Sequence, residues 1–76
     1  MDKIPYFERI RGLREDRDLT QTDIAKVLNI SQQQYQLYES GDREIKLHQF
    51  IELAEYYNVT LDYIAGLTNS KRPLHK

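Results

Sequence analysis

The feature that most constrains the fold is a succession of short segments with helical apolar spacing, each lying between a residue that can start a helix and one that can end it. In the first segment apolar residues recur every third position, at Ile4, Phe7, Ile10 and Leu13. Pro5 suits the first turn of this helix because its φ angle is already near the helical value. Strand-type alternation is nearly absent, so the chain is predicted to be all-α.

The next two segments begin with matching start signals. Thr20 can cap a helix while Asp23 returns the hydrogen bond, and Ser31 with Gln34 repeats this pattern. Asn29 lies between the two segments and tolerates the left-handed conformation that a sharp turn needs. These signals predict two short helices joined by a tight turn, the second closed by Ser40 and Gly41.

Two more helices are expected further on. The fourth is marked by six apolar residues, Leu47, Phe50, Ile51, Leu53, Ala54 and Tyr57, and the fifth by Leu61, Ile64 and Leu67. Asn58 should end the fourth helix, Thr60 should cap the fifth, and Gly66 should end it. Charged runs at 15–18 and 42–46 predict loops. Residues 68–76 have no apolar periodicity, so a basic, flexible C-terminal tail is expected.

Composition limits the class of protein. A chain of 76 residues without cysteine can form one small domain, and neither a disulfide nor a cysteine metal site is available to it. His48 and His75 are too far apart to suggest a metal site. No apolar run could span a membrane and no secretory signal is visible, so we expect a cytoplasmic protein. Neither a Gly-rich phosphate loop nor an acid–base signature is present, so we expect no enzyme and no cofactor.

The charge is unevenly distributed. The chain has 11 basic and 12 acidic side chains and a net charge of −1, whereas nucleic-acid-binding chains usually carry a basic excess. Residues 1–70 hold a net charge of −4, and Lys71, Arg72 and Lys76 restore +3. Net charge alone therefore indicates no function.

The segment 20–41 carries the functional signal. Ala25 would allow its two helices to cross closely, while Ile30, Tyr35 and Tyr38 would fasten the second helix to the core. Four side chains of that second helix would then point outward: Gln32, Gln33, Gln36 and Leu37. Glutamine can bond adenine N6 and N7 together in the major groove, where a helix-turn-helix places the first residues of its second helix. An ordinary solvated helix face is the alternative interpretation.

Residues 6–67 resemble the lambda repressor/Cro-like, or XRE-type, helix-turn-helix domain, with the motif at about 21–40. The matching stretches lie at 10–15, 19–21, 23–25, 31–33, 38–41 and 61–64, with sequences IRGLRE, LTQ, DIA, SQQ, YESG and LDYI. The resemblance implies a compact five-helix DNA-binding domain, often dimeric, in transcriptional regulators of bacteria and phages.

The resemblance also implies roles for individual residues. Gln32 and Gln33 match the principal base-reading positions, and Gln36 and Leu37 match positions that touch bases further along the site. Leu37 replaces a residue that is usually polar or basic in the phage repressors. Five residues are expected at the DNA backbone: Thr20, Gln21, Ser31, Arg43 and Lys46.

Arg14 and Glu39 match a pair that forms an internal salt bridge in the family, so we assign both to structure. The loop that contains Arg43 and Lys46 also holds Asp42 and Glu44, which implies a modest electrostatic contribution to DNA binding.

These observations predict a sequence-specific regulator of transcription, a repressor, that binds double-stranded DNA as a homodimer and inserts helix 31–40 into the major groove. Two alternatives stay open: an antitoxin-type interaction module that also regulates its own operon, and a helical adaptor without DNA binding. Tyr56, Tyr57 and Tyr63 could serve a dimer contact or the core. The tail could be a solvated terminus, an arm that touches DNA, or the start of a further domain.

Overall fold

Pro5 precedes the first helix of the computed structural model, which describes residues 5–75. Over this range the chain forms no strand and five helices: α1 (Tyr6–Asp16), α2 (Gln21–Leu28), α3 (Gln32–Ser40), α4 (Leu47–Tyr57) and α5 (Leu61–Ile64). The predicted all-α, five-helix fold is therefore confirmed. Ile4 and Lys76, which the sequence pattern placed on the first apolar stripe and in the basic tail, lie outside the described residues.

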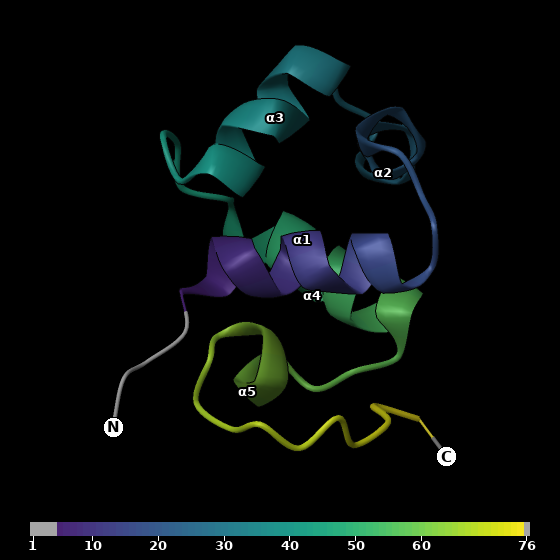
Figure 1. The fold of residues 1–76 in the computed structure, drawn as a ribbon, viewed down its shortest axis with the longest axis vertical. Coiled ribbons are helices and arrows are strands. Elements are labelled where there is room, and N and C mark those ends of the chain that lie inside the picture. The colour runs from purple at the N-terminus through teal and green to yellow at the C-terminus, as the bar shows by residue number, and fades with distance from the viewer. Residues whose placement is uncertain (1–4, 76) are drawn as a thin grey trace.

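Helix α1 crosses the middle of the molecule, with α2 and α3 at one end and α5 and the C-terminal segment at the other (Figure 1). It contacts α3 on one side and α5 on the other. Helix α2 packs against α3 and α4, and α4 also contacts α5. The helix-turn-helix is thus held on a base made of the other helices.

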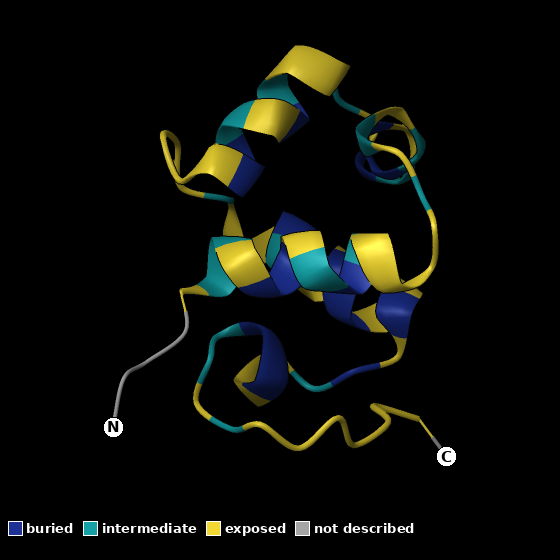
Figure 2. Cartoon of the chain, in the orientation of Figure 1, coloured by how far each residue is buried: buried dark blue, intermediate teal, exposed yellow. Residues whose placement is uncertain are grey.

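The core contains the inward faces of all five helices (Figure 2). Ile10, Ile24, Leu53 and Ile64 are completely buried, and so is the tyrosine ring of Tyr35. Burying a side chain of this size contributes about 1.5–3 kcal/mol. Tyr38, Tyr57 and Tyr63 are buried as well, which favours the core interpretation over a dimer contact for Tyr57 and Tyr63, whereas Tyr56 is 40% exposed.

The first two inter-helix connections follow local backbone signals. Helix α1 continues to Asp16, two residues into the charged run that was expected to be a loop. The Arg11–Glu15 pair, one helical turn apart at 3.4 Å, favours this extension. Asp18 then turns the chain with φ 56°, and Asn29 ends α2 with φ 57°, as predicted.

The predicted face of α4 was partly wrong. Leu47 is 72% exposed and Ile51 is 39% exposed, while Gln49 is buried in their place. The Gln49 side-chain oxygen accepts a hydrogen bond from the Lys46 backbone N–H at 3.2 Å, so this oxygen has a partner although the residue is buried. Phe50, Leu53, Ala54 and Tyr57 form the inner face, as predicted.

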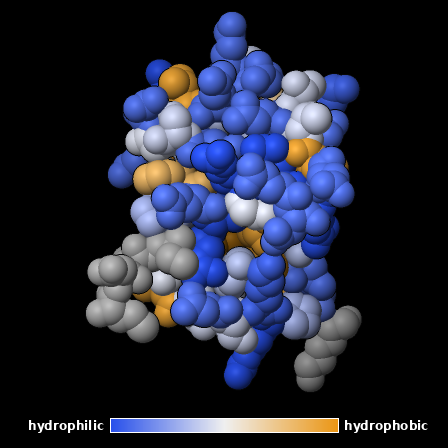
Figure 3. Space-filling view, in the orientation of Figure 1, coloured by the Kyte–Doolittle hydropathy of each residue, from blue (hydrophilic) through white to orange (hydrophobic). Residues whose placement is uncertain are grey.

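The last helix is shorter than predicted. Helix α5 ends at Ile64, Gly66 follows with φ 82°, and Leu67 is 66% exposed rather than part of an apolar stripe. The face seen in Figure 3 is mostly hydrophilic and shows apolar residues only as separate small patches.

The C-terminal segment has no regular structure but contacts the helical body. Asn58 exchanges two hydrogen bonds with the His75 backbone, at 2.8 and 3.2 Å, and its carbonyl accepts one from the Leu74 N–H at 3.3 Å. Arg9 donates to the Asn69 side chain, and Lys71 pairs with Asp16 at 3.0 Å. Flexibility of this tail stays a prediction, but between 68 and 75 it is not detached from the domain.

Candidate nucleic-acid interface

Both ends of α2 are fixed by local hydrogen bonds, and those at its start are reciprocal. The Thr20 hydroxyl accepts from the Asp23 N–H at 3.1 Å, and the Asp23 carboxylate accepts from the Thr20 N–H at 2.9 Å. The predicted capping box is therefore confirmed, and the hydrogen bond that the Asp23 carboxylate accepts from the Thr20 backbone N–H is the largest cause that lowers the pKa of Asp23. After Asn29, the Ile30 N–H donates a hydrogen bond to the Ala25 carbonyl at 3.0 Å. This bond fixes the turn that leads into α3.

The start of α3 differs in one respect from the prediction. The Ser31 hydroxyl caps the helix by accepting from the Gln34 N–H at 3.1 Å. The Gln34 side chain does not return the bond, because its amide donates to the Tyr38 hydroxyl at 2.9 Å. Helix α3 therefore has a serine cap without the reciprocal half of a capping box.

Helix α3 has a sharply divided surface. Gln32, Gln33 and Gln36 are exposed, whereas Leu37 is only partly exposed. The opposite side buries Tyr35, Tyr38 and Glu39. The three predicted glutamines are therefore all exposed on α3, which lies with α2 at one end of the molecule (Figure 1).

A partly buried ion pair ties α1 to α3. Arg14 Nε and Nη2 donate to the two carboxylate oxygens of Glu39 at 2.7 and 3.1 Å, and Arg14 Nη1 donates to the Leu19 carbonyl at 2.8 Å. The Glu39 side chain is only 4% exposed. Burial alone would raise the pKa of Glu39, but the bonds from Arg14 and its other neighbours hold that pKa below its usual value. This is the pair that the resemblance implied.

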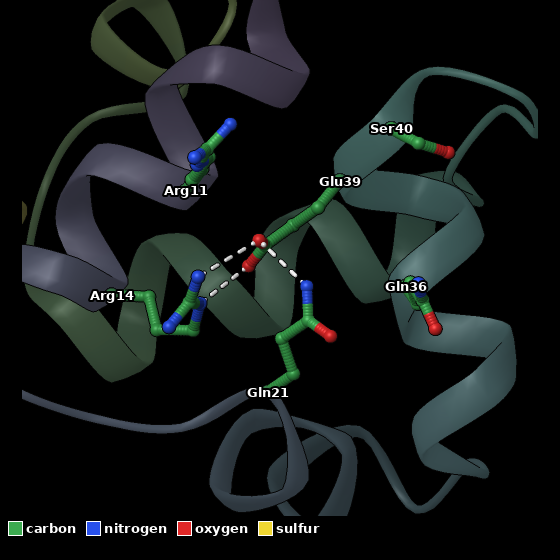
Figure 4. A pocket seen from close by; sticks show the side chains of 6 residues that line it. All are labelled: Arg11, Arg14, Gln21, Gln36, Glu39 and Ser40. Carbon is green, nitrogen blue, oxygen red and sulfur yellow. Dashed lines mark hydrogen bonds and ion pairs between the residues drawn. The ribbon is translucent and has the colours of Figure 1, made fainter.

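The Gln21 side chain makes two hydrogen bonds that the sequence did not predict. Its amide nitrogen donates to Glu39 Oε1 at 3.2 Å, and its amide oxygen accepts from Gln32 Nε2 at 3.1 Å. Figure 4 shows the Gln21 amide beside the Arg14–Glu39 pair. Through its second bond, to Gln32, Gln21 links this ion pair to the exposed face of α3. The two contacts join residues that are 18 and 11 positions apart in the chain, so no local sequence pattern predicts them.

A shallow pocket of about 280 Å³ lies beside this link, between α1, the start of α2 and the end of α3 (Figure 4). Its lining residues are Arg11, Arg14, Gln21, Gln36, Glu39 and Ser40. Arg11 is exposed, and within residues 5–75 its side chain makes only a long 3.4 Å contact with Glu15. Arg11 lies between apolar positions of the first helix, and the sequence gave no reason to single it out.

The loop after α3 exposes Arg43 and Lys46, and neither pairs with a carboxylate of residues 5–75. Asp42 is held back toward α3, where its carboxylate accepts a hydrogen bond from the Ser40 hydroxyl at 2.8 Å. Both cations of the loop are therefore available to a ligand.

Residues 5–75 contain no group of three or more His, Asp or Glu side chains that could hold a metal ion. Within the same range, none of the helices is long and apolar enough to traverse a bilayer.

Residues 10–64 match the model of the helix-turn-helix family, and the chain belongs to this family. It is similar to the uncharacterized HTH-type transcriptional regulator YobD of Bacillus subtilis, with 35% identity over 68 residues, which are 90% of this chain and 61% of that protein. It is also similar to the cryptic phage CTXphi transcriptional repressor RstR of Vibrio cholerae, with 34% identity over 56 residues, 74% of this chain and 50% of that protein.

The fold is shared with a solved structure. A crystal structure of a transcriptional regulator from Listeria innocua has a TM-score of 0.81 to this chain, covering 91% of it and 64% of the regulator at 23% identity. The chain therefore spans about half to two thirds of the length of the proteins that it matches.

Proposed function

We propose that this chain is the DNA-binding domain of a transcriptional repressor that reads double-stranded DNA as a homodimer. The observation that carries the proposal is the exposed face of Gln32, Gln33 and Gln36 on a helix whose other side is fixed in the core. The family membership and the names of the relatives support regulation of transcription on bacterial or phage DNA, in the cytoplasm.

Base reading is assigned to the outward residues of α3. Gln32 and Gln33 stand in its first turn, which a helix-turn-helix brings to the base edges, and Gln36 stands one turn further on. A glutamine amide can accept from adenine N6 and donate to adenine N7 at once. Leu37 is partly exposed and apolar, so it would contact a thymine methyl group or cover the sugar.

Backbone contacts are assigned to the starts of α2 and α3 and to the neighbouring cations. Thr20, Gln21 and Ser31 lie where free N–H groups and the helix dipole favour a phosphate. Arg43 and Lys46 extend this set, because both are exposed in the loop after α3. We add Arg11, which is exposed at the pocket between α1, α2 and α3.

Arg14 and Glu39 serve the architecture in this proposal. Their bidentate bond sets the spacing of α1 and α3, and with it the distance between Arg11 and the glutamine face. A dimer would place two copies of α3 in successive major grooves, about one helical turn or 34 Å apart, and would repress by occupying promoter DNA.

The test is a titration of labelled duplex DNA of the site that the wild-type protein selects from random sequence. Gln33→Ala should weaken binding by about 1–3 kcal/mol and relax specificity at one base pair of each half-site. The matched control is Glu52→Gln, an exposed residue of α4, which should leave the affinity unchanged. Equal affinities for wild type and Gln33→Ala would remove α3 as the reading element, and absence of any selected site would favour the adaptor alternative.

A further inference from the structure

Residues 69–75, here named the strap, lie on the helical body at the end of the molecule opposite α3 (Figure 1). The residues of the body that contact the strap come from α1, from the connection between α4 and α5, and from α5. They are Arg9, Asp16, Asn58 and Tyr63, and together they form the strap site. The strap site is therefore a surface that already binds a peptide segment, and its contacts define which peptides it fits.

Asn58 binds the main chain of the strap. Its side-chain oxygen accepts a hydrogen bond from the His75 N–H at 2.8 Å, and its side-chain nitrogen donates to the His75 carbonyl at 3.2 Å. The Asn58 backbone carbonyl accepts a third bond, from the Leu74 N–H at 3.3 Å. Because all three bonds go to main-chain atoms, Asn58 can hold a peptide of any sequence whose residues at these two positions carry an N–H.

The middle of the strap site favours a cation. Lys71 Nζ lies 3.0 Å from the Asp16 carboxylate and 5.9 Å from the centroid of the Tyr63 ring. A carboxylate attracts positive charge, and so does the face of an aromatic ring. The site therefore fits a lysine or an arginine here, although an ion pair as exposed as this one contributes little free energy.

Arg9 is the residue of the strap site whose hydrogen bonding is incomplete. Its side chain lies with the guanidinium carbon 4.3 Å from the centroid of the Tyr63 ring, and only 9% of the residue is exposed. Nη2 donates to the Asn69 side-chain oxygen. Among residues 5–75, however, the buried Nε has no hydrogen-bond partner and the guanidinium pairs with no carboxylate. A buried cation in this condition costs free energy, so the strap leaves part of its own site unsatisfied.

The Arg14–Glu39 pair shows what would complete the bonding of Arg9. Arg14 donates from Nε and Nη2 to the two carboxylate oxygens of Glu39. Arg9 offers the same two nitrogens, but Asn69 has one acceptor oxygen and a donor nitrogen instead of two acceptors. A carboxylate at the position of Asn69 would accept from both nitrogens and would neutralise the buried charge. The site therefore fits an acidic residue better than the asparagine that the strap supplies.

We propose that the strap site is a docking site for an extended segment of another protein, with an acidic residue against Arg9 and a basic residue, two positions further on, against Asp16. The strap, with Asn69 and Lys71 at these positions, is the weaker occupant and covers the site until such a segment displaces it. This inference does not rest on the proposed function, because the site lies at the other end of the molecule from α3 (Figure 1).

The experiment is an NMR titration of the isotope-labelled full-length chain with two synthetic peptides, residues 68–75 and the Asn69→Asp form of the same peptide. The Asn69→Asp peptide should bind the wild-type chain about 10- to 100-fold more tightly, which is the range for one added hydrogen bond between charged groups. The amide signals around Asn58 and Tyr63 should shift. A peptide of the same composition in scrambled order is the control and should cause no shift.

Two variants of the chain locate the site. Arg9→Gln removes the two nitrogens that face the carboxylate, so both peptides should bind it with equal affinity. Asn58→Gly keeps the backbone conformation, whose φ is 53°, and removes the side-chain amide, so it should weaken both peptides by the same factor. Circular dichroism checks the helical content of both variants.

The strap itself provides a test that needs no folding of Arg9→Gln. Asn69→Asp in the full-length chain should hold the strap more firmly, so hydrogen exchange of the His75 N–H should slow by about tenfold or more. The same variant should bind the Asn69→Asp peptide less tightly than the wild type does, because its site is occupied for a larger fraction of the time. Lys71→Ala should loosen the strap and strengthen peptide binding.

Equal affinity of the two peptides for the wild-type chain would overturn the inference, because Arg9 would then have no preference for a carboxylate. The same conclusion would follow if the preference persisted in Arg9→Gln, or if His75 exchange were unchanged by Asn69→Asp. Binding of neither peptide to the Lys71→Ala chain would also overturn it, because the site would then accept only a segment of its own chain.

Discussion

Two glycines of this chain differ in backbone conformation and in the space around them. Gly41 ends α3 with φ 84°, and a Cβ atom built there would lie 2.9 Å from Cε1 of the Phe7 ring. Gly12 stands in the middle of α1 and a Cβ atom there would meet nothing within 4 Å. The same substitution should therefore have opposite effects at the two positions.

We expect Gly41→Ala to lower the free energy of unfolding by about 1–3 kcal/mol, because alanine is strained in the left-handed region and meets the Phe7 ring. Gly12→Ala should raise that free energy by about 0.5–1 kcal/mol, since glycine is a poor residue in a helix interior. Urea denaturation of both variants checks this pair. A Gly41→Ala protein as stable as wild type would contradict the assigned backbone conformation.

Glu39 makes stability depend on pH. Its pKa is held below the usual value of 4.5, so its stabilising contribution is present above about pH 4.5 and is lost as the pH falls through its lower pKa in the folded state. Glu39→Gln should be less stable at neutral pH and should show a flatter loss of stability on acidification. Thermal unfolding between pH 7 and 3 measures this. The exposed residue Glu44 gives the control, since Glu44→Gln should retain the wild-type profile.

At the scale of the elements, the starts of α2 and α3 differ. Both have a hydroxyl cap, but only Thr20 at α2 has a partner, Asp23, that returns the bond. Thr20→Ala and Ser31→Ala should each cost about 1 kcal/mol of stability, because one helix N–H loses its acceptor. Thr22→Ala, at an exposed position inside α2, is the matched control and should cost nothing. Chemical denaturation of the three variants gives the comparison, and equal stability of all three would show that the caps contribute little.

Local signals made most of the elements predictable. The hydroxyl caps at Thr20 and Ser31 and the left-handed turns at Asn29 and Gly41 act within four residues, so the sequence alone located the helix-turn-helix. The inner face of α4 was harder, because Leu47 and Gln49 both fit a helical period. The helices packed around α4 and the hydrogen bond from the Lys46 backbone N–H to the Gln49 side-chain oxygen decided which one is buried.

The site was predicted less completely than the fold. The outward glutamines of α3 follow from the inward tyrosines at 35 and 38, so their exposure could be derived from spacing. The link from Glu39 through Gln21 to Gln32 joins three helix ends brought together only by the tertiary fold. The contacts of Asn69 and Lys71 with α1 have the same origin, since they join residues 55 to 60 positions apart.

At the scale of the whole molecule, the small net charge bears on how DNA would be held. Helix α3 contains no Lys or Arg between residues 32 and 40, and residues 1–70 carry a net charge of −4. Each phosphate neutralised adds about 0.9 to the slope of log affinity against log salt. We therefore predict a slope of magnitude below about 6 per dimer on the selected site. A steeper slope would show that more cations reach the backbone than are assigned.

Arg11 gives a sharper form of the same prediction. Arg11→Gln should reduce the slope by about 2 per dimer, since each protomer loses one phosphate contact. Lys71→Gln is the control. Lys71 belongs to the C-terminal segment, which lies at the other end of the molecule from α3 (Figure 1), and it pairs with Asp16 of α1. Anisotropy titrations over a series of salt concentrations measure both variants. A smaller slope for Lys71→Gln would instead support the tail as an arm on the DNA.

Selection of bound duplexes from random DNA, run in parallel for the wild type and Gln33→Ala at one stated salt concentration, tests the central claim most directly. We predict that the wild type enriches a twofold-related site with half-site centres about 10–10.5 base pairs apart. Gln33→Ala should lose preference at one base pair in each half-site and keep it elsewhere. A wild-type protein that enriches no sequence, or a Gln33→Ala protein that enriches the same site with undiminished preference, would contradict the account.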